Sequence, residues 1–300
     1  MSAPGPFVLE HSEGGARAAE LLALRAQVFE GAEAGSGFTP EQREWDALDT
    51  LSLHVLARDL DGRLLGAGRL TPDQRIGRFG VVPAWRGQGV ARALLEALLD
   101  TARQRQWPQL RVRVTPAAQA FFGRAGFLPV AGSADLHRRL DGPMAVEDVY
   151  AATLASTALI AQSRRELRIY SRALDPGLFD AAPLQAALRR FSTLRHDKQV
   201  RVLLQEAASP QLLDSPLLRM AQRLPTVFQF RAVSDPVDAS YPSAYLVGDA
   251  QGYYFRSTGN RYDDGEAWLE GAARARQLRT HFEHIWERSR PWSEHRALGL

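Results

Sequence analysis

The chain of 300 residues contains no cysteine, and this absence excludes disulfide bonds, thiolate metal sites and a cysteine nucleophile. Its single lysine is Lys198, so a phosphate-binding loop of the Walker A type, which ends in lysine followed by serine or threonine, is excluded. No run of about 18 apolar residues occurs, as a membrane-spanning helix would require. The first residues include neither a basic nor an apolar segment, so we expect no signal peptide and a cytoplasmic protein.

The chain also lacks a large excess of charge of either sign. It has 37 basic and 34 acidic residues, and the two signs nearly balance both before and after residue 145. A protein that binds nucleic acid has a clear basic excess, so we expect no nucleic-acid partner. The length is that of two domains, and a hydrophobic content of 45% is typical of a globular protein.

The most informative segment joins an apolar strand to a helix through glycines. The strand ends at Val82, the segment Arg86-Gly-Gln-Gly-Val-Ala91 follows, and an amphipathic helix begins at once. Glycines let the main chain approach a ligand closely, and a helix N-terminus offers unpaired N–H groups to an anion. The segment therefore predicts a pyrophosphate site made of backbone amides. A dinucleotide-binding fingerprint fits less well, because Arg92 stands at its third glycine.

This segment resembles the acetyl-coenzyme A loop of the GNAT acetyltransferases. Arg86, Gly89 and Ala91 match the motif [Arg/Gln]-x-x-Gly-x-[Gly/Ala], and Phe121 to Phe127 is similar to the family's F-Y-x-x-x-G-F element. Residues 20–145 further resemble ElaA-type acetyltransferases in several short segments: residues 24–30, Trp45-Asp46 with Asp49, Ser52-x-His54, residues 66–70, residues 126–130 and Gly142-Pro-Met144.

The periodicity of the first half predicts elements in the order α, β-β-β, α, β, α, β, which is the GNAT arrangement with its mixed central sheet. We expect helices at residues 20–29, 84–105 and 117–124, and strands at residues 51–59, 64–70, 77–82, 110–114 and from 127. The fold class is therefore α/β (α+β), with a GNAT domain over residues 1–145.

The resemblance implies acetyl-CoA as the co-substrate and no metal. By position, Val81 and Val82 hydrogen-bond the pantetheine arm through their backbone, as an added strand would. The pyrophosphate lies on the amides of Arg86, Gly87, Gln88, Gly89, Val90 and Ala91. The Arg86 side chain either adds a charge-assisted bond or only shapes the loop, and Phe121 packs either beside the coenzyme or in the core.

The implied reaction is acyl transfer from a thioester to the primary amine of a small molecule or protein. A base must deprotonate the ammonium, and Glu44, Asp46, Asp49 and His54 are the candidates; each alternatively has only a structural or solvated role. A tyrosine often protonates the leaving thiolate in this family, but Phe122 stands at that position. The alternative function is therefore a catalytically impaired acyl-CoA sensor.

The second half predicts a bridging helix over residues 146–164 and then β-α-β-α-β-β-β-α over residues 165–300. This order and the ending Phe282-Glu-His-Ile-Trp286 resemble one half of a phospholipase D-like fold. The catalytic H-x-K-x4-D of that superfamily is missing: with Asp249 at its last position, Ala244 and Pro242 replace the lysine and histidine. We expect a non-catalytic domain that forms a homodimer or keeps a ligand groove; the residues considered for that groove are Arg231, Tyr245, Arg256 and Arg261.

Overall fold

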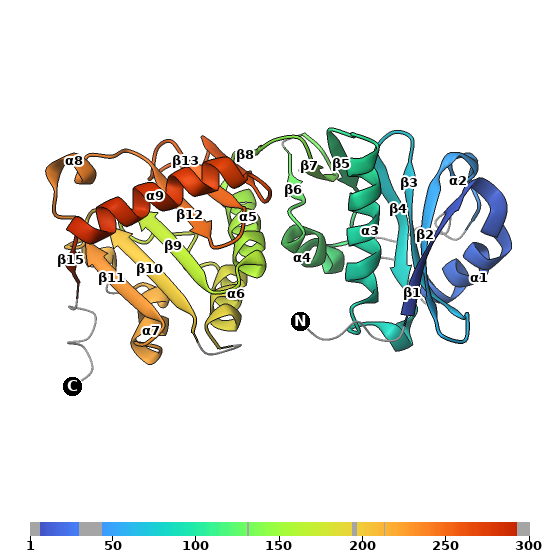
Figure 1. Ribbon diagram of the computed structural model, residues 1–300, viewed down its shortest axis with the longest axis horizontal. Helices are drawn as coiled ribbons and strands as arrows, with labels where there is room; N and C mark the ends of the chain where they lie inside the picture. Colours follow the sequence, from blue (N-terminus) through green and yellow to red (C-terminus); the bar gives the residue numbers. More distant parts are fainter. Residues whose placement is uncertain (1–6, 30–43, 131, 194–196, 213, 293–300) are drawn as a thin grey trace. The chain divides into compact units, whose positions relative to one another are not determined.

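The computed structural model describes residues 7–29, 44–130, 132–193, 197–212 and 214–292 (Figure 1). Its contacts divide the chain into two compact units, one made of residues 1–119 and 132–141, the other of residues 120–131 and 142–300. The division is discontinuous in the sequence, where the sequence predicted one boundary near residue 145.

The first unit is built on a mixed sheet whose strands follow the order β1-β2-β3-β4-β5-β7. Neighbouring strands are antiparallel, except for β4 and β5, which are parallel. The strands are β1 (Phe7–Glu13), β2 (Leu53–Asp59), β3 (Leu64–Thr71), β4 (Arg75–Val81), β5 (Gln109–Val112) and β7 (Leu136–Arg139).

Two helices cover opposite faces of this sheet, α1 (Ala18–Val28) and α3 (Val90–Gln104) (Figure 1). The apolar face of α3 is buried along Leu94 and Leu98, and α1 buries Leu21 and Leu24 against the other side. Shorter helices complete the first part of the chain: η1 (Gly14–Arg17), α2 (Ala47–Leu51), η3 (Pro83–Trp85) and α4 (Pro116–Arg124).

The sequence did not predict β1 or α2. β1 is an edge strand that pairs only with β2, and its Val8 and Leu9 are exposed, so its alternation of apolar and polar residues is weak. α2 has five residues and depends on a capping box, in which Asp46 and Asp49 each accept a hydrogen bond from the other's backbone N–H. Both elements therefore form through contacts that periodicity does not report.

The second unit contains a larger mixed sheet with the strand order β15-β11-β10-β9-β12-β13-β14-β8. β9, β10 and β11 are parallel neighbours, and the other neighbours are antiparallel. Its strands are β8 (Met144–Val146), β9 (Glu166–Ser171), β10 (Gln199–Leu204), β11 (Phe228–Ala232), β12 (Ala244–Gly248), β13 (Tyr253–Arg256), β14 (Gly265–Trp268) and β15 (Arg290–Pro291), and β6 (Leu128–Pro129) also falls in this unit.

Both faces of this second sheet are covered. On one face α9 packs Leu278 and Phe282 against Tyr170 and Val247 (Figure 1). On the other face the alternate strand residues pack against three further helices. The helices of the unit are α5 (Val149–Gln162), α6 (Ala182–Thr193), α7 (Pro216–Arg223), α8 (Pro236–Ala239), α9 (Ala272–Arg288) and the short η4 (Pro210–Leu212).

The helix predicted as a bridge, over residues 146–164, is a core helix of the second unit. It begins at Val149, because the preceding residues form strand β8 beside β14, and its side chains from Ala151 to Ile160 are buried. Alanine, serine and threonine make up much of its surface, and such small side chains allow burial on all sides. Across the described parts of the chain, no helix is long and apolar enough to cross a membrane.

Candidate acyl-CoA site

The candidate site begins where strand β4 leaves its parallel neighbour. β4 pairs with β5 only through Arg75 and Ile76. Its pairing with β3 then skips a residue, because Arg78 and Phe79 together face Gly68, and this extra residue forms a β-bulge. The remainder of β4 keeps β3 as a partner on one side and diverges from β5 on the other. Along the second half of β4, the side of the backbone away from β3 therefore pairs with no other strand among the described residues. We call this side the opened edge of β4.

Of the two valines predicted to bind pantetheine, Val81 is the one that faces this opened edge. The Val82 N–H donates to the Leu65 carbonyl at 2.9 Å, and the Val82 carbonyl accepts from the Trp85 N–H at 3.0 Å. Amide groups alternate in direction along an antiparallel strand, so the Val81 N–H points away from β3. The Val82 N–H is thus hydrogen-bonded within the sheet. The prediction that Val82 binds the pantetheine arm is corrected, because its backbone has a structural role.

The loop after β4 presents backbone rather than side chains. Gly87 and Gly89 have φ angles of +78° and +88°, which favour glycine, and open space lies where a Cβ would stand. The Arg86 Nε donates back to the Val81 carbonyl at 3.2 Å, and the Gln88 amide donates to the Ala84 carbonyl at 2.9 Å. These bonds hold the loop in shape and leave its main chain exposed.

The loop leads into an uncapped helix N-terminus. Gly89 is the N-cap residue of α3 and has no side chain to accept from the first-turn amides, and no acidic residue lies in that turn. Val90 is fully buried and anchors the start of the helix. Backbone N–H groups without a cap, together with the helix dipole, make a ready anion site. Of the residues predicted for the pyrophosphate, 86–89 are exposed, Val90 is buried and Ala91 is half-buried.

The position of the usual tyrosine is buried and has no hydroxyl. Phe122 on α4 is almost completely buried, and its ring makes edge contacts with Phe121 and Phe127, with centroids 5.1 and 5.5 Å apart. This part of α4 belongs to the second unit. Phe121 is half-buried, and its placement beside a coenzyme stays a prediction.

Asp49, predicted as a candidate base, is instead a buried structural anion. Its carboxylate is bonded by Arg25 at 2.6 and 2.8 Å and by Arg69 at 2.7 Å, with no surface exposed. Burial alone raises the pKa of Asp49, but the hydrogen bonds from Arg25, the Asp46 backbone N–H and Arg69 lower it below its ordinary value. An inaccessible carboxylate held by two guanidinium groups does not accept a substrate proton.

His54, the second candidate, is buried as well. Its Nε2 lies 3.0 Å from the Asp49 carbonyl and its ring stacks on Trp45 at 5.7 Å. Burial lowers the pKa of His54, so the ring is neutral and donates to that carbonyl. The structure therefore corrects both predictions, because an acceptor amine reaches neither side chain.

Glu44 is the third of the candidate bases and the accessible one. Its side chain is exposed, and its backbone carbonyl accepts from Arg25 at 3.0 Å, beside the start of α2. The fourth candidate base, Asp46, is half-buried. Burial alone raises the pKa of Asp46, but bonds from Arg69 and Arg78 lower it far below its ordinary value. The sequence did not predict these ion pairs, because they join residues far apart in the chain.

In the second unit, the residues predicted to line a ligand groove have separate structural partners. Arg231 donates to the Trp286 carbonyl, and Arg256 is buried with Asp175 at 2.5 Å. Tyr245 bonds the Nδ1 of His281 at 2.9 Å, and burial raises the pKa of its phenol. The fourth residue, Arg261, pairs with Asp263 at the surface. They do not form one groove.

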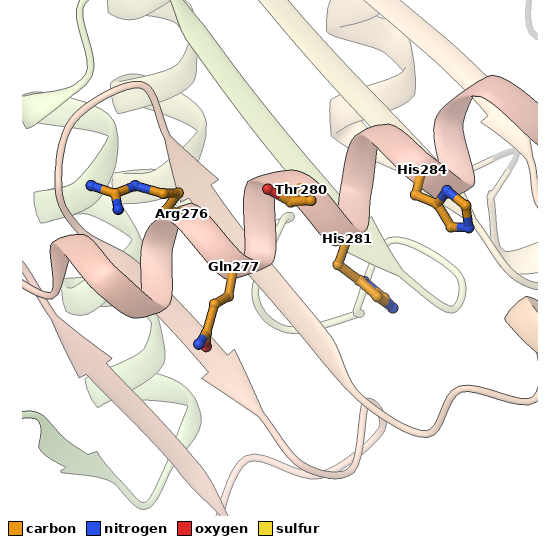
Figure 2. A pocket seen from close by; sticks show the side chains of 5 residues that line it. All are labelled: Arg276, Gln277, Thr280, His281 and His284. Carbon is orange, nitrogen blue, oxygen red and sulfur yellow. The ribbon is translucent and has the colours of Figure 1, made fainter.

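A shallow hollow does lie along the exposed face of α9 (Figure 2). Its lining comes from a single helix and comprises Arg276, Gln277, Thr280, His281 and His284. No cluster of three or more metal-ligating side chains is found in the part of the chain that the structure describes. His281 and His284 lie on this helix, but among the described residues no third metal-ligating side chain joins them to form a metal site.

Two protein-family models match the chain, one in each half. Residues 32–139 match the model described as acetyltransferase (GNAT) domain, and residues 148–298 match the model described as domain of unknown function (DUF7931). No curated protein matches the chain.

Several solved structures are similar to part of the chain. An acyl-CoA N-acyltransferase from Pseudomonas aeruginosa is 26% identical over 44% of this chain and 98% of its own, with a TM-score of 0.36. A GCN5-related N-acetyltransferase from Rhodopseudomonas palustris is 19% identical over 47% and 99%, with a TM-score of 0.38. A GNAT family acetyltransferase from Brucella melitensis, solved in complex with acetyl-CoA, is 19% identical over 45% and 88%, with a TM-score of 0.36.

The N-terminal part of the chain is thus a GNAT acetyltransferase domain, and the protein is an acyltransferase by class. Because the DUF7931 model matches half of its length, the chain belongs to that family.

The burial of His54 predicts a loss of stability in mild acid. Its pKa is lower in the folded protein than in the unfolded chain, so the unfolded chain takes up the proton first as pH falls. The contribution of the neutral His54 to the stability of the fold is therefore fully present above about pH 6.5, the pKa of histidine in the unfolded chain, and declines below that pH. We expect the melting temperature to fall between about pH 7.5 and pH 5.5, and to fall less in His54→Gln.

Thermal unfolding followed by circular dichroism at both pH values measures this difference. His284→Gln is the matched control, because that imidazole is exposed, and it keeps the full fall of the wild type. An equal fall in His54→Gln and the wild type would contradict the assignment.

Proposed function

We propose that the protein is an acetyl-CoA-dependent N-acetyltransferase that transfers an acyl group from the thioester to a primary amine by direct attack. The observation that carries the proposal is the continuous path from the opened edge of β4, through the exposed Gly87–Gly89 loop, to the uncapped N-terminus of α3. The match of residues 32–139 to the GNAT domain model supports it.

The residues present fit such a co-substrate. The Val81 N–H faces the opened edge and suits an amide of an extended pantetheine arm or the carbonyl oxygen of the thioester. The amides of residues 86–91 suit the pyrophosphate, whose charge the N-terminus of α3 stabilises. Bound acetyl-CoA supplies an activated acyl group with a thiolate as the leaving group.

The chain's own residues must remove a proton from the acceptor. Glu44 is the remaining candidate base, because its carboxylate is exposed while Asp49 and His54 are buried. Phe122 has no proton to give to the departing thiolate. In our proposal a water molecule protonates the thiolate.

The alternative is an acyl-CoA sensor with impaired catalysis. The buried Phe122 and the loss of two candidate bases to structural roles favour it. Release of coenzyme A across a broad panel of amines separates the two functions, because a sensor binds acetyl-CoA and releases none.

For the second half we propose a non-catalytic domain with a phospholipase D-like half fold, which mediates a homodimer. The lack of the catalytic histidine and lysine, with Pro242 and Ala244 at their positions, supports the absence of phosphodiester chemistry. A location in the cytoplasm is part of this proposal.

Replacing Gly89 by aspartate tests the coenzyme site. The new carboxylate stands at the N-cap of α3, where it competes with the pyrophosphate for the first-turn amides and repels it. We expect the dissociation constant for acetyl-CoA, measured by isothermal titration calorimetry, to rise by at least about tenfold.

Gly62→Asp is the matched control. Gly62 also has a positive φ, +80°, and open space around its Cβ position, but it lies in the β2–β3 turn. The control therefore binds as the wild type does. Absence of acetyl-CoA binding by the wild type, or unchanged binding by Gly89→Asp, would refute the proposal.

Glu44→Gln tests the base. We expect kcat to fall by about 100-fold while the acetyl-CoA dissociation constant stays unchanged, because the amide cannot accept the proton. Glu96→Gln removes an exposed carboxylate of α3 and leaves kcat as it was. An unchanged kcat in Glu44→Gln would exclude Glu44 as the base.

Sedimentation velocity tests the homodimer. We expect a dimer at micromolar protein concentration, since half-domains of this kind pair about a twofold axis. A monomer at that concentration would refute the dimer and leave the acetyltransferase proposal standing.

A further inference from the structure

The face of the first sheet under α1 and α2 holds a buried cluster with more positive than negative charge. Arg25, Arg69 and Arg78 surround Asp46 and Asp49, and every one of these arginine side chains is at most 10% exposed. Among the residues that the structure describes, three guanidinium groups face two carboxylates, which leaves one positive charge without a carboxylate of its own. A surplus charge out of water is unfavourable unless something pairs with it.

The positive charge without a carboxylate of its own is that of Arg78. Arg69 bonds both oxygens of Asp46 at 2.7 and 2.9 Å, and Arg25 bonds both oxygens of Asp49. Arg78 adds one bond to an Asp46 oxygen that Arg69 already holds, at 2.9 Å, and its Nε has no partner among the described residues. Burial, and then the charge of Arg69, lower the pKa of Arg78, and the bond to Asp46 offsets this only in part.

Arg78 also stands in a backbone conformation that disfavours it. Its φ angle at the bulge is +49°, in the left-handed region where this type of bulge normally has glycine. Holding a larger residue there costs on the order of 1 kcal/mol. Two unfavourable terms, backbone strain and a guanidinium group that shares its only carboxylate with Arg69 among the described residues, thus meet at one residue, and strained residues gather at binding sites.

Arg78 lies close along the strand to the proposed thioester site. Val81 is three positions further along β4, so the two residues are at most roughly 10 Å apart. Its contact with Asp46 places its side chain on the α1 and α2 side of the sheet, the face opposite α3. A group bound by Arg78 therefore lies within reach of an amine placed near Val81.

We propose that Arg78 binds the carboxylate of the acceptor, so that the substrate class is a primary amine that also carries a carboxylic acid. A guanidinium recognises a carboxylate through two parallel charge-assisted bonds. Binding of such a substrate supplies the negative charge that the cluster lacks. This inference rests on the proposed acetyltransferase function.

Two matched pairs of amines test it: 4-aminobutanoate with 4-aminobutanamide, and 6-aminohexanoate with 6-aminohexanamide. Each pair differs in the charge of one terminal group. We expect kcat/KM with acetyl-CoA to favour the acid over the amide by at least about tenfold in one of the two pairs. In Arg78→Gln that preference falls to about twofold or less, through a higher KM for the acid.

Arg78→Gln also separates recognition from folding. The substitution leaves two arginines and two aspartates, a neutral cluster, so we expect its melting temperature to equal or exceed that of the wild type. Arg78→Asn is the second variant, because asparagine tolerates a positive φ. Arg17→Gln, at an exposed ion pair with Glu10 and Glu20, keeps the wild-type preference.

Equal kcat/KM for acid and amide in both pairs, or a preference that survives in Arg78→Gln, would overturn the inference. If none of the four amines is turned over, saturation-transfer NMR compares their binding to the protein loaded with coenzyme A, and equal signals within each pair would also overturn it. Failure of the acetyltransferase proposal is seen separately, as absence of acetyl-CoA binding in calorimetry.

Discussion

The whole candidate site depends on one departure from regular pairing, the bulge at Arg78 and Phe79. A parallel partner would consume the amides of β4, and β5 does pair with it at Arg75 and Ile76. The extra residue turns the strand, so the remaining amides on that side face away from the sheet. Because the glycine loop and α3 follow directly, their position is also set by that turn. The acyl-CoA site is thus a property of main-chain geometry, supported by few side chains.

The side chains matter on the face of the sheet under α1 and α2, where buried charges stand beside the apolar packing. Arg25 and Asp49 form a buried pair beneath Trp45, and Arg69 links this pair to Asp46 at the start of α2. Such a pair stabilises little by itself, yet it fixes α1, α2 and two strands in one arrangement. Beside the apolar contacts of α1, this face of the sheet therefore holds a polar cluster of three arginines and two aspartates.

The conformation of the loop at residues 86–91 was predictable because its signal is local. Gly87 and Gly89 have positive φ angles that favour glycine, and the helix that follows has a clear apolar period, so neighbouring residues suffice to place the loop before α3; its binding of acyl-CoA stays a proposal. The candidate bases were not predictable in this way. Asp49 lies 24 residues from Arg25 in the sequence, and only the folded chain brings the two together and buries them. Sequence reasoning also missed Arg78, since nothing in the order of residues shows that it stands at a bulge.

The second unit also combines elements that follow from the local sequence with contacts that do not. The strands around Tyr170 and Tyr245 and the long helix α9 follow their sequence patterns. The helix α5 was misplaced as a bridge, because an apolar helix in a linker and one in a core have the same composition. The four residues predicted to share a groove each have a separate partner instead, and for three of them this partner lies far away in the sequence.

The segment of residues 120–131 shows that the second unit is not made from one continuous stretch of chain. It packs into the second unit, where Leu128 joins the core and Gly123 lies so near Leu154 that a methyl group would approach to 2.8 Å. Yet residues of the first unit precede and follow it in the chain. A fragment that begins after residue 145 therefore lacks part of the interior of the second unit.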